Sequence, residues 1–380
     1  MEEPRIWLDR ACMTESGTDG GRLDTEACAR NLTAAYFACG NWVAAWCGVD
    51  SGRVVLTAGT TDACDNALLV GGPANSILIH TDLAHECTQR SVYCAADLIS
   101  AVTGRRADTA RVKISDLFHL PPETFSEVLV DRLRKLTGGK AATVVLEHVT
   151  SHDGFRLPIH EISADFAKHM PEIYLVIDGA QATGLWRPPA NLRGAYIGCF
   201  HKYMNGPVGT GFAVLPPAAT DMMPHRLRAT RPVGVCRTGE YLPTTEIGKW
   251  LGCAQAIALF QKHRHIEDRV SIIEALRLHL FAALPRPICE PLDCIRPEYQ
   301  SHILNLHCTD SVSAEQLWRK LDERGFGTKL VASGIRITLH DDLDVDTVDS
   351  FARNLLEAWQ NPFQRRRDAE TSEAVALPMK

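Results

Sequence analysis

The chain has 380 residues, which predicts two domains, or three, at about 150 residues each. Apolar residues make up 45% and charged residues 23%, so the chain can bury a large core and is excluded from the disordered and fibrous classes. The formal net charge of −6 gives no electrostatic reason to expect a nucleic acid or an anionic membrane surface as a partner.

No stretch approaches the roughly 18 consecutive apolar residues of a transmembrane helix. The first residues, Met1–Arg5, have neither the basic nor the apolar segment of a secretory signal peptide. The 13 cysteines are odd in number and include no C-x-x-C pair, which fits neither a disulfide framework nor a zinc ribbon. These features predict a cytoplasmic protein whose thiols are free and mostly buried.

Short β-branched runs alternate with longer helical patterns from residue 53 to about residue 215. Runs that are apolar throughout predict strands covered on both faces, and helices between them predict right-handed crossovers in a mainly parallel sheet. We therefore expect an α/β domain. Its expected strands are residues 53–57, 76–80, 143–147, 173–177 and 211–215, and its expected helices are residues 61–70, 86–96, 123–136 and 159–169.

A second block follows the Pro- and Gly-rich stretch 216–243. It has a helical pattern over residues 245–283 and then short strands and helices, which predict a smaller α+β domain. The expected short strands are 302–307 and 334–339, and the expected helices are 313–324 and 344–359. The expected organisation is an N-terminal arm (1–20), a large α/β domain (21–243), a small domain (244–360) and a flexible tail (361–380).

Loops that follow expected strands carry the chemistry, because ligands of open α/β sheets bind beyond the carboxyl ends of the strands. Thr57–Ala63 joins a strand to a helix, and its small residues and free N–H groups can hold a phosphate. A threonine N-cap is the alternative. Asp178 ends an apolar strand, where a buried carboxylate needs a cationic partner such as a protonated ring nitrogen. A plain Asp-Gly turn is the alternative there.

Two basic residues complete this set. Lys202 precedes the glycine-rich stretch Asn205–Gly211, a setting that suits a Schiff-base amine with a pKa lowered by burial and nearby cations. A solvated lysine is the alternative. His85 lies in the loop after the second expected strand, where its ring can lie over a flat cofactor or cap a helix.

Taken in this order, the motifs resemble the pyridoxal-phosphate-dependent enzymes of fold type I, specifically the class V aminotransferase family with its cysteine desulfurases and isopenicillin N epimerase-like proteins. The resemblance runs from about Ile6 to the end of the small domain. It implies a mainly parallel seven-stranded sheet with helices on both faces, a smaller C-terminal α+β domain, and pyridoxal 5'-phosphate (PLP) as cofactor.

The resemblance also implies roles for individual residues. Lys202 would form the internal aldimine and move the substrate's α-proton, and Asp178 would pair with the pyridinium nitrogen. Arg336 would bind the substrate carboxylate with its bidentate fork. The remaining implied cofactor contacts are His85 stacked on the ring, Gln181 on the phenolic oxygen, Gly59, Thr60, Thr61 and His201 on the phosphate, and Thr245 on the phosphate from a partner subunit, which implies a homodimer.

Two positions depart from the family pattern while still counting among the expected cofactor contacts. Cys199 lies where many relatives have a phosphate-binding serine, and a thiol is a poorer donor. Ser151 falls where desulfurases place an asparagine, whereas the epimerase-like branch often has Val-Thr-Ser at residues 149–151.

The expected reaction begins with deprotonation at Cα of a small amino acid, through an external aldimine and a quinonoid. Aminotransfer comes first because it needs no extra nucleophile, with C–S β-lyase or epimerase as the alternatives. Cysteine desulfurase chemistry is disfavoured, since residues 309–335 contain no cysteine before Arg336.

Two interpretations from other classes are weaker. A catalytically inactive relative is disfavoured because Lys202 and Asp178 are both present. A metal hydrolase built on His148, His152 and His160 lacks a helical His-x-x-x-His motif with a nearby glutamate, so no metal is expected.

Overall fold

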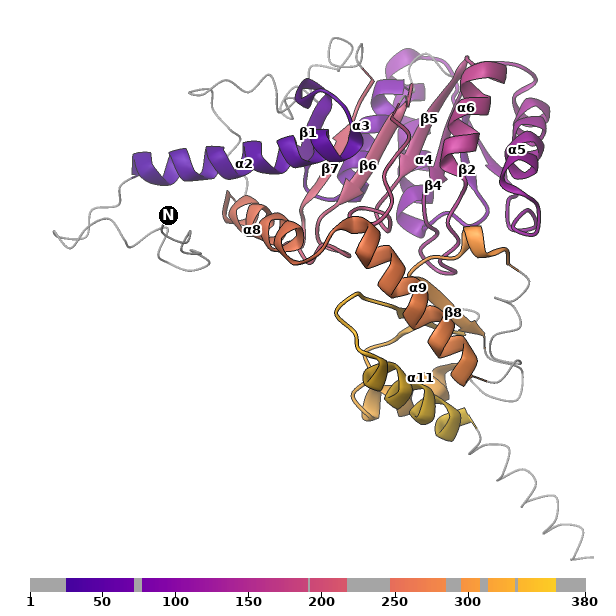
Figure 1. Cartoon of the computed structure of the whole chain (residues 1–380). Helices are drawn as coiled ribbons and strands as arrows, with labels where there is room; N and C mark the ends of the chain where they lie inside the picture. The colour runs from indigo at the N-terminus through magenta and orange to yellow at the C-terminus, as the bar shows by residue number, and fades with distance from the viewer. Residues whose placement is uncertain are drawn as a thin grey trace, which may run out of the picture. The chain divides into compact units, whose positions relative to one another are not determined.

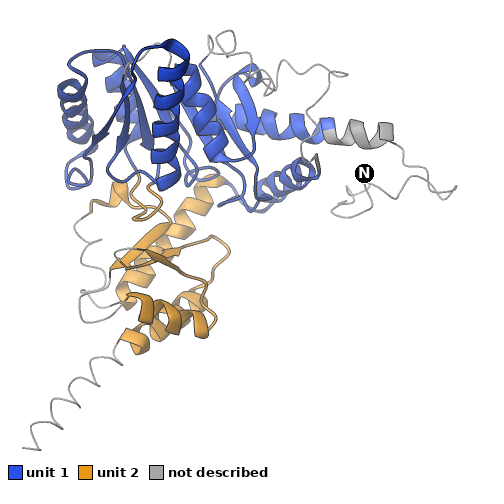
Figure 2. Ribbon diagram, turned by 180° about the vertical axis from the view of Figure 1, so that it is seen from behind, with its two compact units in different colours: residues 1–149, 157–265 blue, residues 150–156, 266–380 orange. Residues whose placement is uncertain are grey.

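The computed structural model describes residues 25–71, 77–190, 192–216, 247–284, 295–307, 314–331 and 334–359. Contacts divide the chain into two compact units (Figure 2). Unit 1 comprises residues 1–149 and 157–265, and unit 2 comprises residues 150–156 and 266–380. The expected arm (1–20) and tail (361–380) lie outside the described residues. The division after His265 differs from the expected domain limit at 243/244, and those expected limits stay a prediction.

Unit 1 is an α/β structure whose elements alternate along the chain (Figure 1). They are α2 (Thr25–Cys47), β1 (Val54–Thr57), α3 (Thr60–Gly71), β2 (Ile77–Thr81), α4 (Glu86–Thr103), β3 (Asp108–Val112), α5 (Pro122–Thr137), β4 (Ala142–Glu147), α6 (Ile159–His169), β5 (Ile173–Asp178), β6 (Ala195–Cys199), β7 (Gly211–Val214) and α8 (Ile247–His263).

The central sheet has seven strands in the order β1-β7-β6-β5-β4-β2-β3. All neighbouring pairs are parallel except the two that involve β7, which runs antiparallel to β1 and β6. The five strands predicted from apolar runs are confirmed, as are the mainly parallel sheet and the flanking helices.

Helices cover both faces of this sheet. One face packs alternate strand residues such as Val145, Val176 and Ile197 against α3 and α4 in a single buried cluster. The connections through α3 and α4 lead toward the β3 edge of the sheet, whereas those through α5 and α6 lead back toward β1. Because such connections are right-handed, α5 and α6 lie on the other face. That second face also holds Trp46 of α2, whose ring centroid lies 5.7 Å from that of Tyr196 on β6.

Two strands of the sheet were not predicted. β3 is an edge strand with mostly exposed side chains and charged residues such as Arg111, so it lacks an apolar run. β6 contains Gly198, a residue that weakens strand propensity. The glycine is required because a Cβ there would lie 2.5 Å from the Phe212 ring.

Unit 2 contains α9 (Ile266–Ala283), β8 (Ile303–His307), α11 (Ala314–Glu323), β9 (Lys329–Val331), β10 (Gly334–Thr338) and a helix over residues 345–359. Its strands form an antiparallel sheet in the order β8-β10-β9. A buried ion pair joins Arg269 of α9 to Asp341, with Nη1 and Oδ2 2.6 Å apart. The expected helical segment 245–283 consists of two helices, because residues 264–265 are not helical.

None of the helices within the described ranges is long and apolar enough to cross a bilayer.

Candidate active site

One edge of the unit 1 sheet collects the residues that the sequence singled out. β1, β4, β5 and β6 end at this edge, and β7 begins there because it runs antiparallel to its neighbours. The carboxyl edge of a parallel sheet is where α/β proteins bind ligands. The loops after these strands therefore form the candidate site.

The turn between β1 and α3 brings two backbones close together. Gly59 has φ +137°, and a Cβ added at Gly211 would lie 2.5 Å from the carbonyl carbon of Gly59. Thr57 Oγ1 donates a hydrogen bond to the Gly59 carbonyl oxygen at 2.9 Å, which fixes the turn. Thr60 opens α3, and Thr61 follows it in the first turn with an exposed side chain.

Thr60 Oγ1 is a buried hydroxyl that satisfies the geometry of no hydrogen bond within the described residues. The Cys199 thiol lies beside it and interacts with it weakly, because sulfur is a poor hydrogen-bond partner. A helix N-terminus with an unsatisfied buried hydroxyl is suited to an anion.

Lys202 lies on a closed turn between β6 and β7. Phe200 N donates to the Thr210 carbonyl oxygen at 3.2 Å, and Gly206 N donates to the Phe200 carbonyl oxygen at 2.7 Å. Asn205 adopts φ +55° and donates its N–H to the Lys202 carbonyl oxygen at 3.0 Å. These bonds fix the backbone of Lys202, whose side chain is half-buried.

His201 lies next to the β1–α3 turn. A Cβ added at Gly59 would lie 3.9 Å from His201 Cε1. His201 Nδ1 is 3.1 Å from the Thr210 carbonyl oxygen, and because a carbonyl only accepts, Nδ1 carries a proton. Burial lowers the pKa of His201 most strongly, the hydrogen bond with the Thr210 carbonyl oxygen partly opposes this, and the charge of Lys202 lowers the pKa further.

The pKa of Cys199 depends on the charged residues around it. Burial raises the pKa of this thiol, the positive charge of Lys202 lowers it, and the negative charge of Asp178 raises it. Its Sγ donates weakly to the Ala180 carbonyl oxygen at 3.7 Å. Cys199 is therefore a buried thiol within electrostatic range of both Lys202 and Asp178.

Asp178 is the last residue of β5 and is 8% exposed. Its Oδ1 accepts a hydrogen bond from Ala180 N at 2.9 Å, and its Oδ2 accepts one from Thr88 Oγ1 at 3.2 Å. The two donors fix the direction of the carboxylate. Gln181 follows in the same turn and is partly buried.

His85 is the N-cap of α4. Its Nδ1 accepts a hydrogen bond from Cys87 N at 3.2 Å, and its Nε2 lies 3.5 Å from a carboxylate oxygen of Glu86. The capping role that the sequence left open is therefore present, and stacking over a cofactor stays a prediction.

Two expected site residues belong to unit 2. Arg336 on β10 donates from Nη1 to the Ser151 carbonyl oxygen at 2.6 Å. Arg336 Nε and Ser151 Oγ are buried, and neither has a hydrogen-bond partner in the described parts of the chain. Burial lowers the pKa of Arg336. The expected phosphate contact Thr245 lies outside the described residues.

Sequence reasoning missed Glu147, which ends β4 at the same edge. It is fully buried, and Thr81 Oγ1 donates to its Oε2 at 2.9 Å. The signal was present in the sequence, because Glu147 ends an apolar strand just as Asp178 does.

Lys249 of α8 was also missed. Its Nζ lies 2.8 Å from where a Cβ at Gly209 would be. The turn that carries Lys202 therefore has a second lysine beside it.

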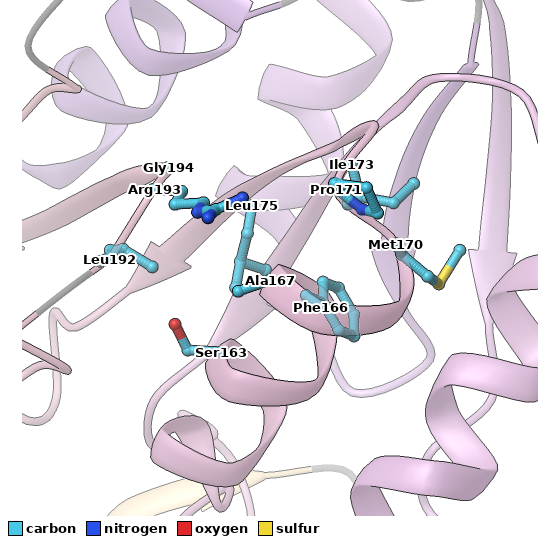
Figure 3. Close-up of a pocket in the computed structure, with 10 residues that line it drawn as sticks. All are labelled: Ser163, Phe166, Ala167, Met170, Pro171, Ile173, Leu175, Leu192, Arg193 and Gly194. Atoms are coloured by element: carbon cyan, nitrogen blue, oxygen red, sulfur yellow. The ribbon is translucent and has the colours of Figure 1, made fainter.

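A hollow on unit 1 lies at the opposite edge of the sheet (Figure 3). It is lined by Ile173 at the amino end of β5, by residues of α6 such as Phe166, and by Leu192. Its lining is apolar apart from Ser163, Arg193 and backbone groups. It contains none of the expected catalytic residues and is not the candidate site.

Comparison with known proteins places the chain in a family. The model of the family described as Aminotransferase class-V matches residues 14–329, so the chain belongs to this family. No curated protein sequence matches it.

Solved structures share the fold at low sequence identity. A complex of the cystine C–S lyase C-DES with cysteine persulfide has a TM-score of 0.69 and 18% identity, covering 87% of this chain and 88% of that one. The cysteine desulfurase CsdA from Escherichia coli has a TM-score of 0.67 and 16% identity, covering 93% and 90%. Serine palmitoyltransferase from S. paucimobilis has a TM-score of 0.58 and 16% identity, covering 86% and 77%.

The protein is a PLP-dependent enzyme of the class V superfamily. The residues present fit that cofactor. The buried hydroxyl of Thr60 and the close backbones of Gly59 and Gly211 suit a phosphate. The fixed carboxylate of Asp178 suits a cationic ring nitrogen, and Lys202 supplies an amine from a rigid turn.

Proposed function

We propose that this enzyme is an aminotransferase that acts at Cα of a small amino acid. The observation that carries the proposal is the pairing of an acid and an amine on neighbouring strand ends. Asp178 ends β5, and Lys202 follows the neighbouring strand β6. The charges of both residues act on the pKa of the buried Cys199 thiol. This pairing is compatible with every candidate reaction that starts at Cα, and aminotransfer is the one that needs no further nucleophile.

Bound PLP supplies an electron sink for the pair of electrons left when a bond at Cα breaks. The chain's own contribution is orientation and proton transfer. Lys202 removes the proton from Cα and returns it to a neighbouring carbon as general base and then acid. Its rigid turn limits the directions from which its amine can approach.

Asp178 keeps the ring nitrogen of the cofactor protonated by offering a fixed negative charge. Ala180 N and Thr88 Oγ1 hold the carboxylate in place without neutralising it. A preorganised charge of this kind costs little reorganisation during the reaction.

Phosphate binding falls to the Gly59–Thr61 turn and to His201. Thr60 Oγ1 gains in this way the hydrogen bond that the described residues do not give it. The Cys199 thiol contributes less than a serine hydroxyl would. Thr245 of a second copy completes the phosphate contacts in the proposed homodimer.

Three further residues have proposed roles around the ring and the substrate. His85 stacks on the ring, with its orientation fixed by the cap on α4. Gln181 and Ser151 bind the ring's phenolic oxygen side. Arg336 binds the substrate carboxylate through its Nε edge, because Nη1 is already bonded to the Ser151 carbonyl oxygen.

C–S β-lyase is the second candidate, supported by the similarity in fold to the cystine C–S lyase C-DES. Both reactions start with removal of the Cα proton. They differ in the next step, which is reprotonation in the aminotransferase and loss of the sulfur leaving group in the lyase. An epimerase returns the proton to the other face of Cα. Sulfur transfer by the desulfurase route lacks its nucleophile, since residues 309–335 contain no cysteine.

Product analysis separates these reactions. The holoenzyme is incubated with proteinogenic amino acids and S-substituted cysteines, with and without a 2-oxo acid. An aminotransferase forms keto acid catalytically only when the 2-oxo acid is present, and releases no ammonia. Release of pyruvate and ammonia without a 2-oxo acid would establish the lyase instead, and formation of the D-enantiomer alone would establish the epimerase.

A further inference from the structure

Glu147 and Asp178 form a register pair at the ends of β4 and β5. Neighbouring strands lie about 4.8 Å apart. Two residues earlier, Val145 and Val176 pack in the same cluster against α3 and α4. Because side chains alternate along a strand, Glu147 and Asp178 point to that same face. The carboxyl groups of Glu147 and Asp178 therefore lie side by side at the edge of the sheet that carries the candidate site.

The two acids are held differently. Each oxygen of Asp178 accepts a hydrogen bond, from Ala180 N and from Thr88 Oγ1. Glu147 accepts one side-chain hydrogen bond, from Thr81 Oγ1 to Oε2 at 2.9 Å, and interacts more weakly with backbone amides at Glu147 and His85. Its Oε1 is buried and has no hydrogen-bond partner in the part of the chain that the structure describes. Asp178 therefore has a donor for each oxygen, whereas the buried Oε1 of Glu147 has none among the described residues, and this disfavours a charge on Glu147.

The groups around Glu147 explain this difference. Burial, and then the charge of Asp178 on β5, raise the pKa of Glu147 to about 7, while the Thr81 hydroxyl on β2 and backbone amides at Glu147 and His85 lower it. From α3, the buried thiol of Cys64 lies within electrostatic range of Glu147. The main contributions to the shift of Glu147 include no lysine or arginine among the described residues.

We propose that Glu147 is a positioning residue that carries the proton of a buried carboxyl pair with Asp178, and that release of this proton strengthens the hold of Asp178 on the cationic ring nitrogen of the cofactor. The first half concerns the protein alone. The second half rests on the proposed function, because it takes the ring nitrogen as the partner of Asp178. Charge on the pair changes from −1 to −2 as the proton leaves, with no other reactant needed.

The first half is tested on the apoprotein by carbon-13 NMR of the glutamate carboxyl groups. Glu147→Gln identifies the signal of Glu147. The expected midpoint of its titration is near pH 7. Asp178→Asn removes the neighbouring charge and should lower that midpoint by about one pH unit or more. Thr81→Val removes a donor to the ionised form and should raise it.

A glutamate signal that titrates near its ordinary value of about 4.3, or a midpoint that ignores Asp178→Asn, overturns the carboxyl pair. If Glu147→Gln does not fold, the other two variants still decide the matter. The wild-type protein must then show a glutamate signal with a midpoint near pH 7, and that midpoint must fall in Asp178→Asn and rise in Thr81→Val. If no such signal is found, the carboxyl pair is refuted.

The second half is tested by adding PLP. A cationic ring nitrogen near the pair stabilises ionised Glu147, so the midpoint should fall when PLP binds, and by linkage PLP should bind more tightly as Glu147 ionises. The ratio of the PLP dissociation constants, Glu147→Gln over wild type, should therefore increase through pH 7. A midpoint and a ratio that stay constant refute the link to the cofactor. A protein that binds no PLP would refute the proposed function and leave the apoprotein result standing.

Discussion

His201 Nδ1 lies 3.1 Å from the carbonyl oxygen of Thr210, across the turn that carries Lys202. This bond holds the ring proton on Nδ1 and leaves Nε2 as an acceptor in the neutral imidazole. A phosphate needs a donor at Nε2, which His201 offers only when it is protonated. Burial, the largest effect, and the nearby Lys202 oppose that state, and because the Thr210 bond offsets them only in part, the pKa of His201 is lowered.

PLP binding should therefore be coupled to protonation of His201. A bound phosphate raises the pKa of His201 from its lowered value, so the stabilisation is present at low pH and is lost as pH rises through the raised pKa, by up to about tenfold in affinity per pH unit. The PLP dissociation constant is measured for wild type and His201→Asn between about pH 5.5 and 8.5, which spans the ordinary histidine range. The ratio of the two constants at each pH cancels the effect of the phosphate's own ionisation. A ratio that does not change with pH contradicts the coupling.

Lys202, and not Lys249, should be the lysine that reacts with PLP. Both amines lie near the same turn, which makes Lys249 a matched control. Borohydride reduction followed by peptide mass analysis should find the cofactor on Lys202 in wild type and in Lys249→Ala. Lys202→Ala should lose at least about 100-fold in turnover, the usual contribution of a general base, and can still bind PLP. Attachment to Lys249 in the wild-type enzyme would remove Lys202 from its proposed role.

The close approach of Gly211 to Gly59 should make this glycine irreplaceable. An alanine Cβ would meet backbone atoms of Gly59 at 2.5 to 2.8 Å, and backbone cannot move aside as a flexible side chain can. Gly211→Ala should cost about 1–3 kcal/mol in the free energy of unfolding and weaken PLP binding.

Gly248 is the control for that substitution. It lies in α8, and among the described residues no atom outside the helix backbone lies within 4 Å of where its Cβ would be, so Gly248→Ala should be neutral or stabilising by up to about 1 kcal/mol. Denaturant unfolding of both apoproteins provides the comparison. Equal unfolding free energies for the two variants would show that the Gly59 turn yields easily.

The sequence predicted the parts of the fold that local patterns encode. Apolar runs located β1, β2, β4, β5 and β7, since each of these strands is covered on both faces. β3 was not predicted because an edge strand needs no apolar run. β6 was not predicted because it contains Gly198, whose need to be glycine comes from contact with the Phe212 ring on a neighbouring strand. The break between α8 and α9 also lies in residues that are individually compatible with a helix.

The candidate site shows the same limit. Asp178 and Lys202 could be predicted because each has a distinctive local setting, a strand tip and a glycine-rich turn. Glu147 also ends an apolar strand, but the role proposed for it depends on its register with Asp178, and the sequence does not show which strands are neighbours. The cap made by His85 was one of two alternatives in the sequence, and the bond from Cys87 N shows that it forms.

Arg336 should govern substrate affinity. Its Nε edge is buried without a hydrogen-bond partner in the described residues of unit 2, and a carboxylate would provide bidentate bonds to it. Arg336→Lys keeps the charge and loses the fork, so KM for the amino acid should rise about tenfold or more.

Lys329, the register partner of Arg336 on β9, is the matched control because its side chain is exposed. Lys329→Gln removes a charge of the same sign from the adjacent strand and should leave KM within about twofold. Initial-rate kinetics on both variants give KM and kcat separately. Because uniform loss of carboxylate binding raises KM without lowering kcat, a fall in kcat alone for Arg336→Lys would mean that this arginine acts on the folded shape of unit 2 and not on the substrate.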